Sequence, residues 1–215
     1  MSARQIDPAR LMERLAQRRS LFHSEADFQH AFAWEMHQLM PAWNIRLEVP
    51  VRAETGVIHL DLLACLNEFR IAIELKYKTR ALTSSVNGEE FALADQAAQD
   101  LGRYDFFNDL QRIETFVRSG GGQSGYAVFL TNDSAYWKQP SAIGHGYASF
   151  AMSDGRKVSG ALGWGERASA GTRRKREVEI TIRGSYDLRW IDYSSVAAKR
   201  YGVFRYLCIK VNGAK

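Results

Sequence analysis

The sequence predicts an α/β fold, in which a mixed β-sheet is flanked by helices and followed by a β-rich C-terminal extension. Three observations support this class. Short segments rich in Val, Ile and Leu follow one another closely between residues 45 and 77, as successive strands do. A helical repeat of apolar residues comes next, and a compact apolar run at 125–131 then indicates a buried strand. The predicted order of elements is therefore α, β, β, β, α, β.

Local signals define each element in chain order. Pro8 suits the first turn of a basic helix. Ser24, with Asp27 three residues later, is typical of a helix start, and Pro41 ends that helix. The predicted helices cover residues 8–19, 25–39 and 89–116, and the predicted strands cover 45–52, 56–66, 69–77 and 125–131. After Asn132, many Gly and Ser residues and alternating apolar positions predict mostly antiparallel strands.

Length and composition set the organisation and the setting of the chain. Its 215 residues suit one domain over 1–215, with a basic helix in 1–20, a core at 24–131 and the extension at 136–215. A hydrophobic content of 46% excludes a disordered chain. No apolar window could span a membrane, and charges stand where a signal peptide needs an apolar run. Two cysteines without a Cys-x-x-Cys motif suit a reducing compartment. We therefore expect a cytoplasmic protein without a membrane partner.

The second and third strands carry acids in unusual positions. If Asn67 and Glu68 form a two-residue turn, opposed residue numbers sum to 135, so that Asp61 lies opposite Glu74. A four-residue loop would put Asp61 opposite Lys76, and both registers leave the three side chains on one face. Two facing carboxylates are destabilising unless a positive charge lies between them. The pattern fits either a solvated hairpin face with a weak ion pair or a hard-oxygen site for Mg²⁺.

These residues carry a resemblance to a known family. Asp61, twelve intervening residues, and Glu74-Leu75-Lys76 in a β-hairpin, after a helix that bears Glu35, resemble the PD-(D/E)XK nuclease superfamily. The element order over residues 24–131 is similar to that family's common core. Leu60 stands where the family pattern has Pro, and the Gln-x-x-x-Tyr signature of its RecB-like branch is absent. The resemblance implies a restriction-endonuclease-like αβββαβ core and Mg²⁺-dependent hydrolysis of phosphodiester bonds, in DNA rather than RNA.

The resemblance also implies residue roles. Asp61, Glu74 and the carbonyl of Leu75 would bind Mg²⁺ or Mn²⁺, and Lys76 would position or deprotonate the attacking water. The remaining candidates keep two interpretations each. Glu35 is either a further metal ligand or the partner of a lysine. Lys78 shares the strand face of Lys76, so that either lysine could support catalysis. Gln96 either forms a hydrogen bond near the site or is a buried structural residue.

The charge balance is compatible with nucleic acid as the partner. The chain has 29 Lys and Arg against 24 Asp and Glu, a net charge of +5. A basic run could contact phosphates or form a solvated loop; it consists of Arg173, Arg174, Lys175 and Arg176. The main alternative for the whole chain is a catalytically silent nucleic-acid-binding or protein-interaction module with the same fold, and a hydrolase for a small phosphoester is a third interpretation. A homodimer is compatible with the sequence.

Overall fold

The computed structural model describes residues 6–53, 56–140 and 145–213. Its main feature is a mixed six-stranded sheet with the strand order β1-β2-β3-β6-β10-β9. The strands of this sheet are β1 (Asn44–Ala53), β2 (Gly56–Leu66), β3 (Phe69–Lys78), β6 (Ser124–Thr131), β9 (Trp190–Ser195) and β10 (Val203–Asn212). β3 and β6 pair in parallel, and the other neighbours pair antiparallel. Within the described part of the chain, no helix is long and apolar enough to cross a membrane.

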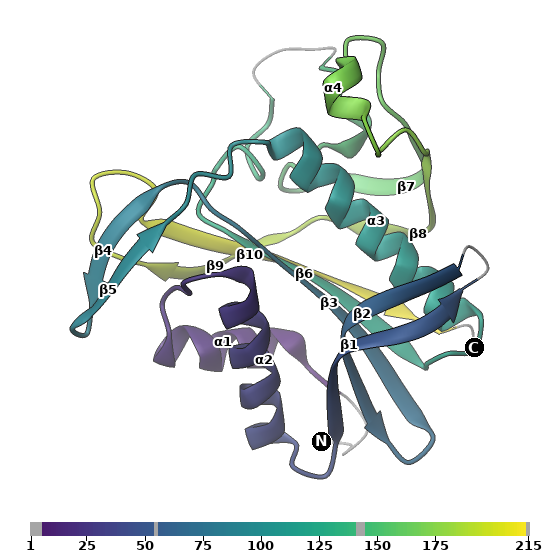
Figure 1. The fold of residues 1–215 in the computed structure, drawn as a ribbon, viewed down its shortest axis with the longest axis horizontal. Helices are drawn as coiled ribbons and strands as arrows, with labels where there is room; N and C mark the ends of the chain where they lie inside the picture. The colour runs from purple at the N-terminus through teal and green to yellow at the C-terminus, as the bar shows by residue number, and fades with distance from the viewer. Residues whose placement is uncertain (1–5, 54–55, 141–144, 214–215) are drawn as a thin grey trace.

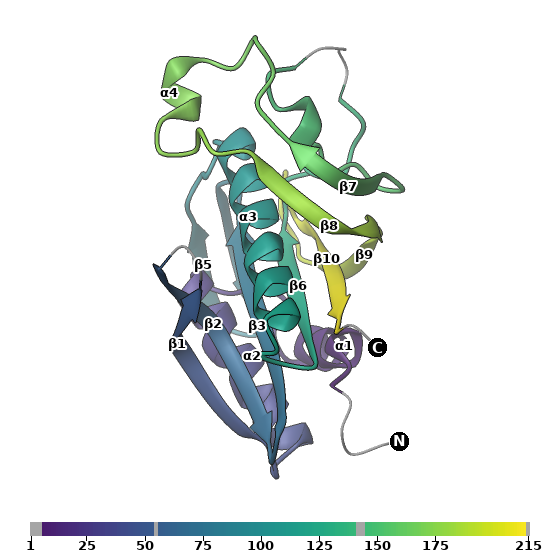
Figure 2. The ribbon, with the colours of Figure 1, turned by 90° about the vertical axis from the view of Figure 1, so that its right-hand side faces the viewer.

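Helices cover both faces of the sheet, which confirms the α/β class. α1 (Pro8–Arg18) and α2 (Glu25–Leu39) lie on one face, and α3 (Gln99–Arg118) lies on the other (Figures 1 and 2). Asp7 caps α1, and Ser24 caps α2 by accepting a hydrogen bond from the Asp27 amide. These side chains satisfy backbone donors that have no partner within the helix. Both helices lie where the sequence predicts them.

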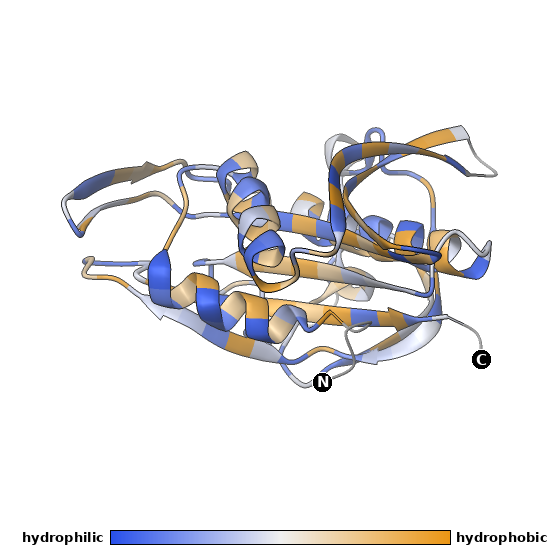
Figure 3. Cartoon of the chain, turned by 90° about the horizontal axis from the view of Figure 1, so that it is seen from below, coloured by the Kyte–Doolittle hydropathy of each residue, from blue (hydrophilic) through white to orange (hydrophobic). Residues whose placement is uncertain are grey.

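The side-chain alternation of β3 divides the interior into two cores. Ile71, Ile73, Leu75 and Tyr77 pack with α1 and α2. Ala72 packs in the second core, with α3 and with the alternate residues of β6. Figure 3 shows hydrophobic residues along the strands of the sheet and alternating hydrophobic and hydrophilic residues along the helices. Because residues 74 and 76 have the parity of Ala72, their side chains project toward α3.

The predicted helix over 89–116 is wrong in its first part. β4 (Leu82–Val86) and β5 (Glu89–Leu93) form a hairpin, and α3 begins only at Gln99. Asn87 and Gly88 join the two strands with φ of 52° and 82°. Asn-Gly is the preferred pair for a two-residue turn in which both residues have positive φ. This turn outweighs the helical spacing of apolar residues that favoured a helix.

The C-terminal segment is integral to the sheet and to the second core. β9 and β10 extend the main sheet from β6. β7 (Lys157–Leu162) and β8 (Ile180–Asp187) form a separate antiparallel pair whose apolar residues pack with α3. The short helical elements are η1 (Ala148–Phe150) and α4 (Ala170–Arg173). The β-rich character predicted for residues 136–215 therefore corresponds to strands that complete the core.

β2 leaves the sheet at Asp61. The predicted two-residue turn is confirmed, since β2 and β3 pair from Leu66 and Phe69 to Leu62 and Ile73 with a constant register. Beyond this point β2 pairs only with β1, and residues 49–53 and 56–60 form a two-stranded ribbon beside the C-terminal half of α3 (Figure 1). Glu48, at the position opposite Asp61, has a φ of 50°, which is unusual for a residue other than glycine. Leu62 packs in the first core whereas Leu60 packs in the second, so the ribbon turns toward α3 at this bend.

Candidate active site

The departure of β2 leaves one edge of β3 without a neighbouring strand. Three side chains accept hydrogen bonds from the backbone amides along this edge. Leu75 N donates to Asp61 Oδ2 (2.7 Å), Tyr77 N to Glu25 Oε2 (2.9 Å) and Thr79 N to Gln96 Oε1 (3.1 Å). In a strand the C=O and N–H of one residue point to the same side, so the Leu75 carbonyl also faces this gap. The amides of this edge are therefore satisfied by side chains and not by a neighbouring strand.

Four charged side chains from β3 and α3 meet beside this edge. Lys76 Nζ lies 3.0 Å from Asp109 Oδ2, and Arg112 Nη1 lies 3.0 Å from Asp109 Oδ1. Arg112 Nη2 lies 2.9 Å from Glu74 Oε1 and also donates to the carbonyl of His59 on the ribbon. We call Asp61, Glu74, Lys76, Asp109 and Arg112 the candidate site. The three residues predicted from the sequence, Asp61, Glu74 and Lys76, thus lie together.

Glu74 is a buried carboxylate with too little positive charge around it. Its side chain is 2% exposed. Burial raises its pKa well above the ordinary value of 4.5, and the charges of Asp109 and Asp61 and a hydrogen bond with Asp61 raise it further. Arg112 lowers this pKa but does not compensate. Although Arg112 is close, Glu74 Oε1 accepts no hydrogen bond of ordinary geometry from any described residue.

Lys76 carries a firmly held positive charge. Burial lowers its pKa, but Asp109 and the carboxylate of Glu25, 3.8 Å away, raise it more, so that the pKa lies above its ordinary value. Asp109 is itself fully buried: burial raises its pKa, and Lys76 and Arg112 act in the opposite direction. At neutral pH Lys76 is therefore a cation and not a free amine that could accept a proton.

Asp61, Glu74 and the Leu75 carbonyl fit the needs of Mg²⁺. This ion is bound in proteins by one or two carboxylates, together with waters and substrate phosphate. The raised pKa of Glu74 and its unfilled Oε1 both mark a place where an added cation would be stabilising. Among the described residues, no group of three or more His, Cys, Asp or Glu side chains is arranged to hold a metal. The fit therefore depends on two carboxylates and one backbone oxygen.

Glu35 lies elsewhere, so its prediction as a metal ligand needs correction. Its carboxylate is 2% exposed and pairs with Arg14 and, at 3.1 Å, with Arg18 of α1. The acid of α2 that reaches β3 is Glu25, ten residues earlier and about 15 Å away along the helix axis. The apolar side of α2 faces α1 as well as the sheet, and the arginines of α1 neutralise Glu35. In the sequence Glu25 resembles an ordinary acid of a helix first turn, and no signal distinguishes it.

Gln96 and Lys78 lie at the far end of β3. Gln96 is exposed and precedes α3, so the expectation that it faces inward is wrong. It holds the strand end instead, since its backbone amide donates to the Thr79 carbonyl (2.8 Å) and its side chain accepts from the Thr79 amide. Lys78 is half-buried on the face of Lys76 and has no ion pair with a described residue. Lys78 is thus a free cation near the open edge.

The basic run at 173–176 is largely used for internal contacts. Arg176 forms two hydrogen bonds with the Asp105 carboxylate on α3, at 2.7 and 2.9 Å. Arg173 donates to the carbonyls of Gly165 and Glu166. The side chains of Arg174 and Lys175 are exposed and form no ion pair in the described part of the chain, and the Lys175 backbone amide donates to Glu177 Oε1 (3.0 Å). Half of the run therefore fixes this segment, and half is available to an anion.

Sequence reasoning missed the contribution of α3 to the site. Asp109 and Arg112 are three residues apart on the helix that covers the Glu74 face and therefore share one side of it. This Asp-x-x-Arg spacing is a signal that could have found them. It becomes meaningful only when it is known which side of α3 faces β3.

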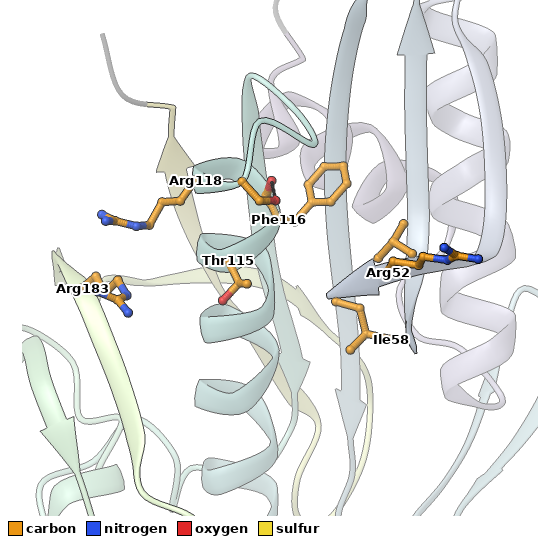
Figure 4. Close-up of a pocket in the computed structure, with 8 residues that line it drawn as sticks. Arg52, Ile58, Thr115, Phe116, Arg118 and Arg183 are labelled. Atoms are coloured by element: carbon orange, nitrogen blue, oxygen red, sulfur yellow. Dashed lines mark hydrogen bonds between the residues drawn. The ribbon is translucent and has the colours of Figure 1, made fainter. Parts of the chain in front are cut away.

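A cleft of about 510 Å³ adjoins the site at the C-terminal end of α3 (Figure 4). It lies between α3, the ribbon and β8. Its lining consists of Val51, Arg52, Ile58, Thr115, Phe116, Arg118, Ser119 and Arg183. The three arginines are exposed and form no ion pair with the described acids. The cleft therefore has three cations in its lining and lies next to the contact between Arg112 and His59, because Ile58 and Thr115 are among its lining residues.

Comparisons with family models, with curated proteins and with solved structures found no match for this chain. The functional interpretation therefore depends on the residues and geometry described above.

Proposed function

We propose that this protein is a metal-dependent nuclease that hydrolyses phosphodiester bonds, in DNA rather than RNA. The observation that carries the proposal is Glu74: a buried carboxylate with a raised pKa, beside Asp61, where β2 has ceased to pair with β3 and side chains bind the strand edge instead. Strongly perturbed acids with specific charged neighbours are typical of functional sites. A purely structural role would not require two like charges to lie together.

The order of elements supports a restriction-endonuclease-like core within this fold. α2, β1, β2, β3, α3 and β6 follow one another as α, β, β, β, α, β, and the β4–β5 hairpin is inserted before α3. The motif residues come from the bend in β2 and from the adjacent stretch of β3. The sequence motif and its topological setting thus agree.

Each residue of the site has a proposed role. Mg²⁺ or Mn²⁺, held by Asp61, Glu74 and the Leu75 carbonyl, would polarise the phosphodiester and supply an activated water. Lys76, as a cation, would orient the water and stabilise the negative charge that develops on the phosphate. Asp109 is a positioning residue, because it holds both Lys76 and Arg112. Arg112 would offer its guanidinium to a phosphate oxygen once a metal has neutralised Glu74.

A second candidate is a silent nucleic-acid-binding module with the same fold. The contact of Arg112 with Glu74 favours it, since a guanidinium already provides part of the missing positive charge. In that case the site would need no metal, and the exposed cations around it would bind nucleic acid without cleavage.

Cleavage and metal binding distinguish the two candidates. We expect Mg²⁺-dependent cleavage of DNA by the unmodified protein, reduced about 100-fold or more in Asp61→Asn and in Glu74→Gln, the scale of losing one electrostatic stabiliser. Asn can still accept from the Leu75 amide, so the fold should persist. Glu90→Gln, which replaces an exposed acid of β5, is the matched control. Mg²⁺ or Mn²⁺ should raise the melting temperature of the unmodified protein but not of Asp61→Asn. DNA binding with neither cleavage nor a metal response would instead establish the silent module.

A further inference from the structure

We propose that the cleft between α3 and β8 binds a backbone phosphate of the nucleic acid, through Arg118 and Arg183. The identity of the anion as nucleic acid rests on the proposed function, and the cleft would bind a part of the substrate outside the candidate site. The cleft itself is a feature of the structure whatever the reaction is.

A buried carboxylate fixes β8 against α3 at this point. Glu114 is 3% exposed. It accepts hydrogen bonds from the backbone amides of Arg183 (2.8 Å) and Gly184 (2.7 Å) and from the hydroxyl of Tyr186 (2.8 Å). Such bonds to an ionised acceptor are among the stronger ones in proteins. The backbone that carries Arg183 is thus held firmly to α3, and both oxygens of Glu114 are already in use.

This clamp places Arg183 and Arg118 in the lining of one cleft, and the acid next to them, Glu114, is already bound by the amides of Arg183 and Gly184 and the Tyr186 hydroxyl. Arg118 follows Glu114 by four residues and so lies on the same side of α3, one turn further on. Figure 4 shows Arg118 and Arg183 on the same side of the helix. Both are exposed, and neither forms an ion pair within residues 6–53, 56–140 and 145–213. Neighbouring like charges repel, and an anion between them would remove this repulsion.

The chemistry of the cleft suits a phosphate group. Two guanidinium groups can donate several hydrogen bonds to phosphate oxygens. The hydroxyls of Thr115 and Ser119 in the same lining already donate to the carbonyls of Gln111 (2.9 Å) and Phe116 (3.0 Å), so the arginines are the donors that the cleft offers. Phe116, Val51 and Ile58 add apolar surface, on which the sugar of a nucleotide could rest. Arg52 stands on the ribbon side and provides a further cation at the rim (Figure 4).

The cleft and the candidate site are both lined by α3. Arg112, Thr115 and Arg118 follow at intervals of three residues and therefore form one inclined row on the helix surface. Arg112 and Arg118 are separated by a rise of about 9 Å along the helix axis and point in directions about 120° apart around it, since six residues complete one and two-thirds turns. A nucleic-acid strand whose reactive phosphate lies at Glu74 and Asp61 would therefore have to pass around α3 for another of its phosphates to reach the cleft.

Salt-dependent binding tests the inference separately from cleavage. Binding to a DNA duplex is measured by fluorescence anisotropy in EDTA for two proteins. One carries Asp61→Asn only, and the other carries Asp61→Asn together with Arg118→Ala and Arg183→Ala. Loss of two phosphate contacts should weaken binding roughly 50-fold at 0.1 M salt and reduce the slope of log K against log[salt] by about 1.8. Arg189→Ala removes an exposed arginine of the β8–β9 turn and is the control. It should change the slope by less than about 0.9, which is the value for one phosphate contact.

The possible outcomes separate the phosphate cleft from the nuclease proposal. Unchanged affinity and slope in the double variant overturn the phosphate cleft, whether or not the unmodified protein cleaves DNA. Arginine-dependent binding by a protein that never cleaves DNA supports the cleft and removes the nuclease. If inorganic phosphate alone abolishes the difference at millimolar concentration, the cleft binds a free anion and the nucleic-acid assignment fails. A protein that binds no DNA refutes both proposals.

Discussion

Glu114 allows a prediction whose size follows from the structure. Glu114→Ala removes one acceptor from three donors, the amides of Arg183 and Gly184 and the Tyr186 hydroxyl. A hydrogen bond to a charged group contributes about 1.5–3 kcal/mol. These donors lie near the surface, where water can partly replace the carboxylate, so we take about 1 kcal/mol for each. The expected loss in the free energy of unfolding is therefore about 3 kcal/mol.

Urea and thermal unfolding followed by circular dichroism measure this loss. For a chain of this length 1 kcal/mol corresponds to about 2–4 °C, so the melting temperature should fall by about 6–12 °C. Glu114→Gln keeps one acceptor oxygen and should lose about half as much. Glu179→Ala, an exposed acid just before β8, is the control and should stay within about 0.5 kcal/mol. A loss in Glu114→Ala no larger than in this control would refute the clamp and, with it, the fixed position of Arg183.

Two further predictions concern the acids of the site. Because the folded state holds the Glu74 proton more tightly than the unfolded state, the unmodified protein should lose stability relative to Glu74→Gln as pH rises from 4.5 through the raised pKa. The melting temperatures in EDTA should coincide near pH 4.5 and separate by pH 8, and a constant difference would contradict this. Glu35→Gln should leave metal-dependent cleavage within about twofold, whereas Glu25→Gln should lower it about tenfold through Lys76. Equal losses of cleavage in Glu35→Gln and Glu25→Gln would contradict the placement of Glu25, and not Glu35, next to Lys76.

The parts of the fold that local rules control were predictable from the sequence. The β2–β3 hairpin follows from a two-residue turn and the parity of its side chains, and both place Asp61, Glu74 and Lys76 on one face. Caps and a proline define α2. The β4–β5 hairpin is equally local, because the Asn87–Gly88 turn defines it, but the helical spacing of the apolar residues around it conceals that turn.

The rest of the site depends on how elements pack. Glu35 is buried, but its partners are arginines of α1, whose position no local pattern reveals. Asp109 and Arg112 enter the site because α3 packs on the Glu74 face in one particular rotation. The bend at Glu48, after which β2 no longer pairs with β3, is also invisible in the sequence, since glutamate does not favour a left-handed backbone as glycine does.

The pairing of β6 with β10 has a consequence for how this protein folds. β6 lies between β3 and β10, and the residues that pair across β6 and β10 are roughly 80 positions apart in the chain. Contacts between such distant residues form slowly, because a long loop must close first. Until β10 arrives, a chain that has folded as far as β6 exposes an apolar strand with unpaired amides and carbonyls, which is a template for aggregation. Residues 24–131 carry the candidate site, yet they depend on the C-terminal strands for solubility during folding.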